Sequence, residues 1–590
     1  MKHILFISAI LLAITPLQAR QADQIPDSPK HEFRSAWVAT VPGLDWPSAN
    51  HPGNEAGLRG LIQNMKLRGM NAVVLQVVPR GDAFFPSERL PWARQLTGTY
   101  GKDPGWDPLA VAIDESRRLG MEIHAWYNVF RIGDATGIEQ VPGDGPQHVY
   151  LTNPEWVRTV SAAPNSLWLN AGIPDARMWA IQNVMEIVRN YDIDAIHFDF
   201  IRYEQGGYSD DFTIRDQYNP EGIVTIGDWR RWNVTEFNRV VSDSVRALKP
   251  WVKIGSTPVG HYNSSGGWAF LNGFAAVFQD SRRWLREGYN DYLAPQLYWD
   301  IGGGDAPQFD WLVRDWMGEN YGRHIYVGTG PYKPNVASEL PRQIDTMRVN
   351  HAHGHMHFRH AFVRGAAIYG ERYNQPSLVP PMGWKDMNQP NSPELLAAVL
   401  HEDGSNTVSV SWQAPDFGRG KPEPVRFAVY RVPLSDLAST LEESIADASF
   451  LIGMTGETDF TDTPEFDAIG YEYVVTSLSR NNVESEPAVT GIATSIDDER
   501  QLAGSFRLEQ NYPNPFNPTT NIRFSLDEAA HVRLAVYDLL GRVVATPVNG
   551  NHTAGVHTIG FDASHLSSGV YLYRLEAGNR QLTRKMLLIK

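Results

Sequence analysis

Short apolar runs alternate with segments of helical period between about residue 32 and residue 370 of this 590-residue chain. The runs are rich in β-branched and aromatic residues, and each is followed by a stretch long enough to form a helix. Such an alternation predicts parallel strands joined by helices. Eight runs have this character: 34–41, 71–78, 122–129, 195–201, 253–259, 291–299, 324–330 and 354–359.

The segment 175–191 shows the helical period. Met178, Ile181, Met185 and Val188 recur at i, i+3, i+7 and i+10, which places them on one face that can cover a sheet. Eight strand and helix pairs in about 340 residues predict a (β/α)8 TIM barrel, a fold that commonly takes about 250 residues and grows by loop insertions. A doubly wound open sheet is the alternative, although no Gly-rich phosphate loop follows the first strand.

After residue 384 the pattern changes to short strands with a period of two, such as NTVSVSW, RFAVYRV and YEYVVTSL. We expect an all-β domain over residues 390–495, which resembles a fibronectin type III sandwich. Trp412 is its candidate core tryptophan, and Tyr473 is a candidate tyrosine corner. The polar, acidic linker SIDDERQLA follows.

The C-terminal segment, 505–590, begins with three closely spaced prolines, Pro513, Pro515 and Pro518, which favour an extended lead-in to a small β module. Its motifs NYPNPFNPTT, VYDLLGRVV and GVYLYRL resemble a type A C-terminal sorting domain of the type IX secretion system. The resemblance implies a Gram-negative host, the type IX machinery as a partner, and export to the cell surface or the medium.

The N-terminus also predicts export, and the composition excludes several kinds of partner and site. Residues 1–19 combine Lys2, an apolar core and the small-residue end LQA, as a secretory signal cleaved after Ala19 does. No later segment approaches the roughly 20 apolar residues of a membrane span, so we expect none in the mature chain. The formal net charge of −15 argues against nucleic acid as a partner, and a cysteine count of 0 excludes disulfides and thiolate metal sites.

Polar and flat aromatic side chains stand at the carboxyl ends of the predicted strands, where (β/α)8 barrels carry their active sites. Asp199 interrupts an otherwise apolar strand, and a buried carboxylate needs a partner or a purpose. The mixture suits a carbohydrate, whose C–H faces stack on aromatic rings while its hydroxyls need polar partners. The candidate substrate contacts are Arg80, His124, Trp126, Asn128, His197, Arg202, Tyr203, Gln296, Tyr298, Trp299 and His357.

Glycoside hydrolysis commonly uses two carboxyl groups, one as acid and one as nucleophile or base. We expect Asp199 to be the ionised member, because Arg202 or Arg80 would lower its pKa. Asp300 follows an aromatic pair that would raise its carboxyl pKa, which makes it the candidate acid, and Asp82 competes for that role.

Each of these carboxylates can instead have a purely structural role. Asp199 can be a buried polar anchor, and Asp300 and Asp82 can be helix caps. The histidine-rich stretch 351–360 carries no carboxylate at a fixed spacing, so we predict neither a metal site nor a cofactor.

Several segments together resemble the glycosyl hydrolase-like 10 family of exported bacterial proteins. They include FRSAWVATVPGLDWP, QVVPRGDAFFPS, EIHAWYNVFR, YDIDAIHFDFIRY, WLREGYNDYLAPQLYWDIG and SLVPPMGW, and they span a predicted domain over 32–384. The resemblance implies a TIM barrel, and a member is credited with activity on peptidoglycan strands that lack stem peptides. Many members read HFDDYFYP where this chain reads HFDFIRY, so Phe200 replaces a second aspartate.

The sequence therefore predicts an exported glycoside hydrolase that uses two carboxylates on a bacterial glycan, for which we expect peptidoglycan strands without stem peptides. The alternative is a non-catalytic surface protein for carbohydrate binding or adhesion, which the substitution at Phe200 and the appended β domains would suit. A metal-dependent hydrolase that uses the histidine-rich stretch is the third hypothesis.

Overall fold

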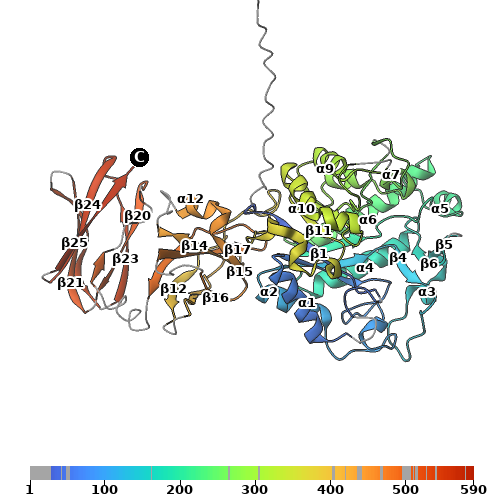
Figure 1. Cartoon of the computed structure of the whole chain (residues 1–590), viewed down its shortest axis with the longest axis horizontal. Helices are drawn as coiled ribbons and strands as arrows, with labels where there is room; N and C mark the ends of the chain where they lie inside the picture. The colour runs from blue at the N-terminus through green and yellow to red at the C-terminus, as the bar shows by residue number, and fades with distance from the viewer. Residues whose placement is uncertain are drawn as a thin grey trace, which may run out of the picture.

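The computed structural model describes residues 28–590 apart from 42, 48–52, 161–162, 264–265, 303–305, 402–404, 419, 435–440, 465–469, 494–505, 509–510, 512–513, 515, 527, 539–540, 554 and 579. The predicted signal peptide at 1–19 and the acidic linker lie outside the described residues. Figure 1 shows a large α/β body, coloured blue to yellow, beside an orange β domain and a red C-terminal β module.

The α/β body is a closed barrel of eight parallel strands, as predicted. Its strands follow one another around the barrel in chain order, and those at its centre are buried on both faces. They are β1 (Phe33–Val38), β2 (Ala72–Val78), β3 (Glu122–Asn128), β7 (Ala195–Asp199), β8 (Lys253–Ser256), β9 (Tyr292–Leu293), β10 (His324–Thr329) and β11 (Gly354–His357).

Helices surround the barrel (Figure 1), and their caps lie where the sequence supplies them. Asn54 and Thr225 accept hydrogen bonds from the first turns of α1 and α6, and Asp107 does so ahead of Pro108 in α2. The helices are α1 (Glu55–Leu67), α2 (Pro108–Arg118), α3 (Val149–Thr152), α4 (Pro174–Asn190), α5 (Asp211–Gln217), α6 (Ile226–Leu248), α7 (Gly273–Ala276), α8 (Ser281–Arg286), α9 (Phe309–Gly318), α10 (Pro334–Val349) and α11 (His360–Val363).

One face of α4 differs from the prediction. Ile181, Met185 and Val188 are buried as expected, but Met178 is 46% exposed. Ala180 and Val184 complete the buried face instead. A 3.6-residue period drifts along a straight helix, so the first member of the predicted stripe turns away from the barrel.

The chain inserts a small antiparallel sheet between β3 and α4, which the sequence pattern did not predict. It consists of β4 (Arg131–Asp134), β5 (Val157–Val160) and β6 (Ala163–Leu169) in the order β4, β6, β5. Backbone N–H groups of Val129 and Phe130 donate to the carbonyls of Asp199 and Phe200, and this pairing anchors the insertion to the carboxyl end of β7.

The region after the barrel is all β, as predicted, whereas its fibronectin type III character stays a prediction. It forms one seven-stranded sheet in the order β15, β14, β17, β18, β12, β13, β16. Trp412 packs in its core, with its ring 5.3 Å from that of Phe427, and the buried Tyr473 donates to Asp462. Its strands are β12 (Glu394–Leu400), β13 (Val408–Gln413), β14 (Pro424–Pro433), β15 (Leu451–Thr455), β16 (Asp459–Asp462), β17 (Tyr471–Ser479) and β18 (Ala488–Ala493), and α12 (Leu441–Ala446) packs on β14.

This domain contacts the amino-terminal end of the barrel. Asn482 donates to Glu122, the first residue of β3, at 2.8 Å, and Arg426 forms an ion pair with Asp194, the residue before β7. The opposite end, where the strands terminate, is left free by this contact.

The C-terminal module forms two sheets around one apolar core. One sheet has the order β19, β20, β23, and the other has the order β22, β21, β24, β25. Among the described residues no helix is long and apolar enough to span a membrane. The strands are β19 (Arg507–Leu508), β20 (Thr519–Leu526), β21 (Ala530–Tyr537), β22 (Val543–His552), β23 (Gly555–Asp562), β24 (Gly569–Ala577) and β25 (Arg580–Leu588).

Candidate active site

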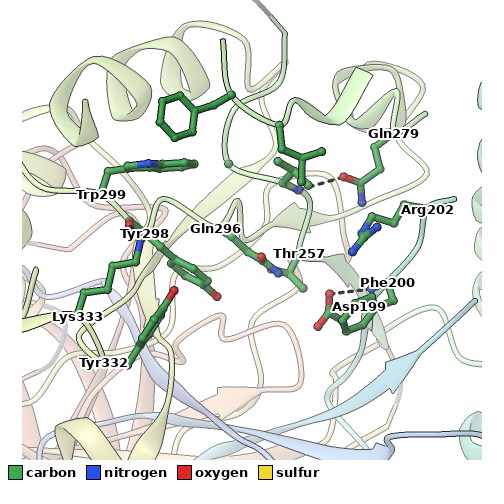
Figure 2. Close-up of a pocket in the computed structure, with 14 residues that line it drawn as sticks. Asp199, Phe200, Arg202, Thr257, Gln279, Gln296, Tyr298, Trp299, Tyr332 and Lys333 are labelled. Carbon is green, nitrogen blue, oxygen red and sulfur yellow. Dashed lines mark hydrogen bonds between the residues drawn. The ribbon is translucent and has the colours of Figure 1, made fainter. Parts of the chain in front are cut away.

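A cavity of about 260 Å³ opens at the carboxyl ends of β7 to β10 (Figure 2). Asp199 is the last residue of β7, Thr257 follows β8, Gln296 and Tyr298 follow β9, and Tyr332 follows β10. Active sites of (β/α)8 barrels lie at this end because the strand-to-helix loops there vary without disturbing the barrel. This cavity is therefore the candidate active site.

Asp199 is partly buried and held by its own strand end. Its Oδ1 accepts a hydrogen bond of 2.7 Å from the backbone N–H of Phe200. Phe200 has a φ of 49°, a left-handed conformation that is uncommon for a bulky residue. Backbone strain of this kind persists only where the surroundings enforce it, and it concentrates at functional sites.

The pKa of Asp199 is raised to about 6, because burial disfavours its carboxylate. The Phe200 N–H and the guanidinium groups of Arg202 and Arg131 oppose this effect without reversing it. The expectation that a neighbouring arginine keeps Asp199 ionised with a lowered pKa is thus wrong. A carboxyl with a pKa near 6 suits a group that delivers a proton near neutral pH.

Cations and aromatic rings stack next to Asp199. The guanidinium of Arg202 lies 5.1 Å from the ring of Phe200 and 4.9 Å from that of Trp168, and Arg131 lies 5.5 Å from the Phe200 ring. Trp168 comes from β6 of the inserted sheet. This stack fixes Phe200 and keeps positive charge close to the carboxyl group.

The other side of the cavity is aromatic. The rings of Tyr298 and Tyr332 meet edge to face at 5.8 Å, and those of Trp299 and Phe270 do so at 6.4 Å. Burial and the nearby Asp199 raise the pKa of Tyr298, so its hydroxyl keeps its proton. Figure 2 shows Tyr298, Trp299 and Tyr332 on the side of the cavity opposite Asp199, where a sugar ring could stack.

Polar groups sit between the two walls. The Gln279 side chain accepts from the Val259 N–H at 3.0 Å and donates to the Ile201 carbonyl at 3.2 Å. Sequence reasoning missed Thr257, Gln279, Tyr332, Lys333 and the apolar pair Phe270 and Leu271. Thr257 and Tyr332 follow predicted strands, so the strand-end rule applied to β8 and β10 would have found them, whereas Gln279 and Phe270 come from a long loop with no such signal.

Two predicted contacts lie inside the barrel rather than in the cavity. His197 Nε2 accepts from the Trp37 indole at 3.0 Å, so its Nδ1–H donates to the Tyr292 hydroxyl, also at 3.0 Å. Tyr292 then donates to His124 Nδ1 at 2.8 Å, and His124 Nε2–H donates to Glu122 at 2.9 Å. Burial lowers the pKa of both histidines, which keeps them neutral in this chain of hydrogen bonds.

Other predicted contacts are also buried outside the cavity. Trp126 donates to Asn128 at 2.9 Å, and Asn128 donates to the Pro79 carbonyl at 2.7 Å. Tyr203 is 1% exposed, and His357 hydrogen-bonds Thr329 and Tyr373. These side chains support the rim and the wall of the barrel and do not line the cavity.

The remaining predicted carboxylates lie apart from Asp199. Asp300 is exposed and does not line the cavity, which contradicts the apolar surroundings expected for it. Asp82 and Arg80 line a second, smaller cavity. Of the predicted set, Asp199, Arg202, Gln296, Tyr298 and Trp299 are the residues that the structure brings together, and Asp199 is the one acidic side chain among the described residues that line the site.

Metal ligands do not cluster in the described part of the chain: no three His, Asp or Glu side chains there are arranged to hold an ion. The histidine-rich stretch instead supplies wall contacts, as His355 and His357 both hydrogen-bond the Tyr373 hydroxyl.

Known proteins resemble both the barrel and the C-terminal module of this chain. Residues 510–590 match the secretion system C-terminal sorting domain, which indicates that the protein is secreted or displayed at the cell surface. Glycosyl hydrolase YngK of Bacillus subtilis is 32% identical over 82% of this chain and 96% of its own length. Glycosyl hydrolase DigH of Escherichia coli K12 is 29% identical over 55% of this chain and 79% of its own.

Among solved structures, an endo-β-1,4-mannanase from Thermotoga petrophila aligns with 95% of this chain and 98% of its own at 10% identity, with a TM-score of 0.36. Residues 32–345 match the glycosyl hydrolase-like 10 model. The chain therefore belongs to the glycosyl hydrolase-like 10 family and is a glycoside hydrolase.

Proposed function

We propose that this glycoside hydrolase cleaves glycosidic bonds in peptidoglycan strands that lack stem peptides, with Asp199 as its general acid. The observation that carries the proposal is the raised pKa of Asp199, about 6, opposite an aromatic wall at the barrel rim. The neutral carboxyl would give its proton to the leaving glycosidic oxygen as the C–O bond breaks. Water would then add to the anomeric carbon and lose a proton, and reprotonation of the Asp199 carboxylate would complete the cycle.

The charge of the site supports this choice of substrate. Removal of a stem peptide leaves a free lactyl carboxylate on the sugar, and Arg202 and Lys333 both line the cavity. Lys333 Nζ donates to the Tyr298 carbonyl at 2.7 Å, which holds its ammonium beside the aromatic wall. An anionic, unsubstituted strand matches such a site better than a neutral or peptide-bearing one.

The second group of the two-carboxylate mechanism has no assigned residue. Asp300 and Asp82 lie outside the cavity, as described above. Some glycosidases use the 2-acetamido group of the substrate in place of a second carboxylate, and peptidoglycan sugars carry this group. The anomeric configuration of the first product would separate inversion from the two retaining routes.

Product analysis tests the proposal. The wild-type protein is incubated with amidase-treated peptidoglycan, with intact peptidoglycan and with neutral chito-oligosaccharides, and soluble products are identified by mass spectrometry. We expect fragments from the amidase-treated strands that the Asp199→Asn variant does not release. Binding of the strands without any release would favour the carbohydrate-binding alternative, and Trp299→Ala would then weaken that binding.

Export is the second part of the proposal. The sorting domain would require passage across the inner membrane first, for which we propose residues 1–19 as a signal peptide cleaved after Ala19. N-terminal sequencing of the protein recovered from the cell surface or medium tests this cleavage site.

A further inference from the structure

A second cavity of about 150 Å³ is lined in part by Ile132, Gly133 and Asp134 of β4. The loop after β2 contributes Arg80 and Asp82, and the 3-10 helix at Arg94–Leu96 contributes Gln95. Tyr100 and six residues between Ile132 and Ile138 also line it.

Three polar atoms at this cavity have no hydrogen-bond partner: Asp82 Oδ1, Gln95 Oε1 and the Tyr100 hydroxyl. Asp82 is only 2% exposed and Tyr100 only 6%, so water replaces few of the missing bonds. A buried polar atom without a partner costs roughly 1–3 kcal/mol, and native proteins retain few such atoms. Three of them around one cavity indicate a site built for a ligand.

The walls of this cavity are held in place before any ligand arrives. His148 Nε2–H donates to the Arg80 carbonyl at 2.9 Å and to the Ile132 carbonyl at 3.2 Å, which ties the two walls together. Its Nδ1 accepts from the Tyr150 N–H, which fixes this tautomer. Gly133 has a φ of 111°, and a Cβ there would meet Arg80 Cβ at 2.9 Å, so the close approach needs glycine.

The charges around the cavity are balanced, which defines the class of ligand. Asp82 faces Arg80 at 3.7 Å, and Arg94 pairs with Glu139 at 2.5 Å. Two guanidinium groups disfavour a metal cation, while an anion would meet the unpaired Asp82 oxygen. A carboxylate oxygen and an amide oxygen accept hydrogen bonds, and a tyrosine hydroxyl can accept as well as donate. Together the three atoms call for a neutral molecule that donates through hydroxyl or amide groups.

A short strand connects this cavity to the active site. Arg131, at the start of β4, stacks on the Phe200 ring at 5.5 Å and pairs with Asp134 at 3.1 Å. Asp134 lines the second cavity, and Phe200 lines the first. β4 therefore contacts the lining of both cavities.

We propose that the second cavity is a sugar-binding subsite for a neutral, hydroxylated residue of the same glycan, remote from the bond that is cleaved. The proposal rests on the proposed function and adds that the enzyme prefers long strands and cuts within them. Asp82 and Tyr100 are binding residues in this account, and neither takes part in the proton transfers.

Strand length is the variable that tests this subsite kinetically. We compare wild type with Asp82→Asn and Tyr100→Phe on long amidase-treated strands and on the shortest oligosaccharide that is cleaved. We expect kcat/KM on long strands to fall about tenfold, as the loss of one good buried hydrogen bond does, with little change on the shortest substrate. Equal losses on both substrates, or no loss on either, would overturn the proposal.

A neighbouring carboxylate provides the matched control. Asp103→Asn changes an exposed residue close in sequence that accepts from the Gly105 N–H at 2.7 Å and faces neither cavity. Its kinetics should follow wild type on every substrate. Thermal unfolding of each variant identifies any loss that comes from misfolding.

A second measurement does not depend on turnover. Crystals of the Asp199→Asn variant are soaked with N-acetylglucosamine oligomers. A sugar hydroxyl or amide within hydrogen-bond distance of Asp82 Oδ1 and the Tyr100 hydroxyl supports the subsite, and an empty second cavity overturns it, whether or not the first is occupied. Failure of wild type to cut amidase-treated strands would instead refute the proposed function, so the two failures are distinguishable.

Discussion

The backbone N–H of Phe200 donates to the carboxylate of Asp199 at 2.7 Å while Phe200 itself holds a φ of 49°. The left-handed residue turns the chain sharply at the end of β7, so the carboxyl group faces the cavity while the following ring packs against Trp168. Phe200 thus holds the Asp199 carboxylate through its backbone and anchors the strand end through its ring.

Asp199→Asn should abolish most of the hydrolytic activity. Loss of a general acid typically costs about 10²- to 10⁴-fold in rate, and the amide keeps the size of the side chain. The measurement is release of soluble fragments from amidase-treated peptidoglycan. Asp216→Asn, an exposed carboxylate on α5, is the control and should retain full activity. Equal rates for the two variants would remove Asp199 from the chemistry.

The activity should depend on pH through the same group. If Asp199 acts as the acid, kcat/KM falls as pH rises through about 6, because the carboxyl loses its proton there. Arg202 lowers the pKa of Asp199, so Arg202→Gln should move this alkaline limb to higher pH. A limb that stays in place in the Arg202 variant would show that another group sets it.

Asp199→Asn should also stabilise the barrel above pH 6. The folded-state pKa of about 6 exceeds the ordinary 3.8, so the carboxyl costs no stability below pH 3.8, and its cost grows as pH rises to 6. The full cost is up to about 3 kcal/mol from the size of the shift, and partial exposure reduces it. Calorimetric unfolding at pH 7.5 should show the variant melting higher, with the difference shrinking toward pH 4.

Lys333→Met should separate anionic from neutral substrates. If the ammonium binds the lactyl carboxylate, its loss raises KM for amidase-treated strands about tenfold, the scale of one charge-assisted contact at a partly exposed site. Methionine keeps an apolar stem of similar length, so the change removes chiefly the ammonium, which lies 5.8 Å from the Tyr332 ring and donates to the Tyr298 carbonyl. Neutral chito-oligosaccharide binding serves as the comparison, and an equal loss there would attribute the effect to shape and not to charge.

The barrel could be predicted from sequence because its strands are buried on both faces and form continuous apolar runs that are easy to count. The rule that active-site residues lie at the carboxyl ends of barrel strands found Asp199, Gln296 and Tyr298, because these ends meet at one rim. It failed for His124 and His197, which lie on the inward face of β3 and β7 but too deep in the barrel to reach the cavity.

Other features depend on segments far apart in the sequence. The inserted sheet lines the cavity of Asp82, and its strands have no clean alternation: β6 is exposed over its first half and buried over its second. The raised pKa of Asp199 depends on burial by neighbouring elements, whereas the nearby arginines visible in the sequence suggested the opposite direction. Local pattern cannot supply either fact.

The ion pair between Arg426 and Asp194 should couple the second domain to the barrel. Asp194 also accepts from the Ile123 N–H at 2.9 Å, so it connects β14 to the start of β3. Arg426→Gln removes the ion-pair partner of Asp194, whose side chain is 10% exposed and keeps the Ile123 N–H, so the cost is below the roughly 3–5 kcal/mol of a fully buried pair. We expect the barrel transition to melt earlier in calorimetry, and Asp194→Asn in the same chain to recover part of the loss. Arg480→Gln, whose partner Asp192 is 35% exposed, should cost under about 1 kcal/mol. An unchanged barrel transition in the Arg426 variant would show that the two domains unfold independently.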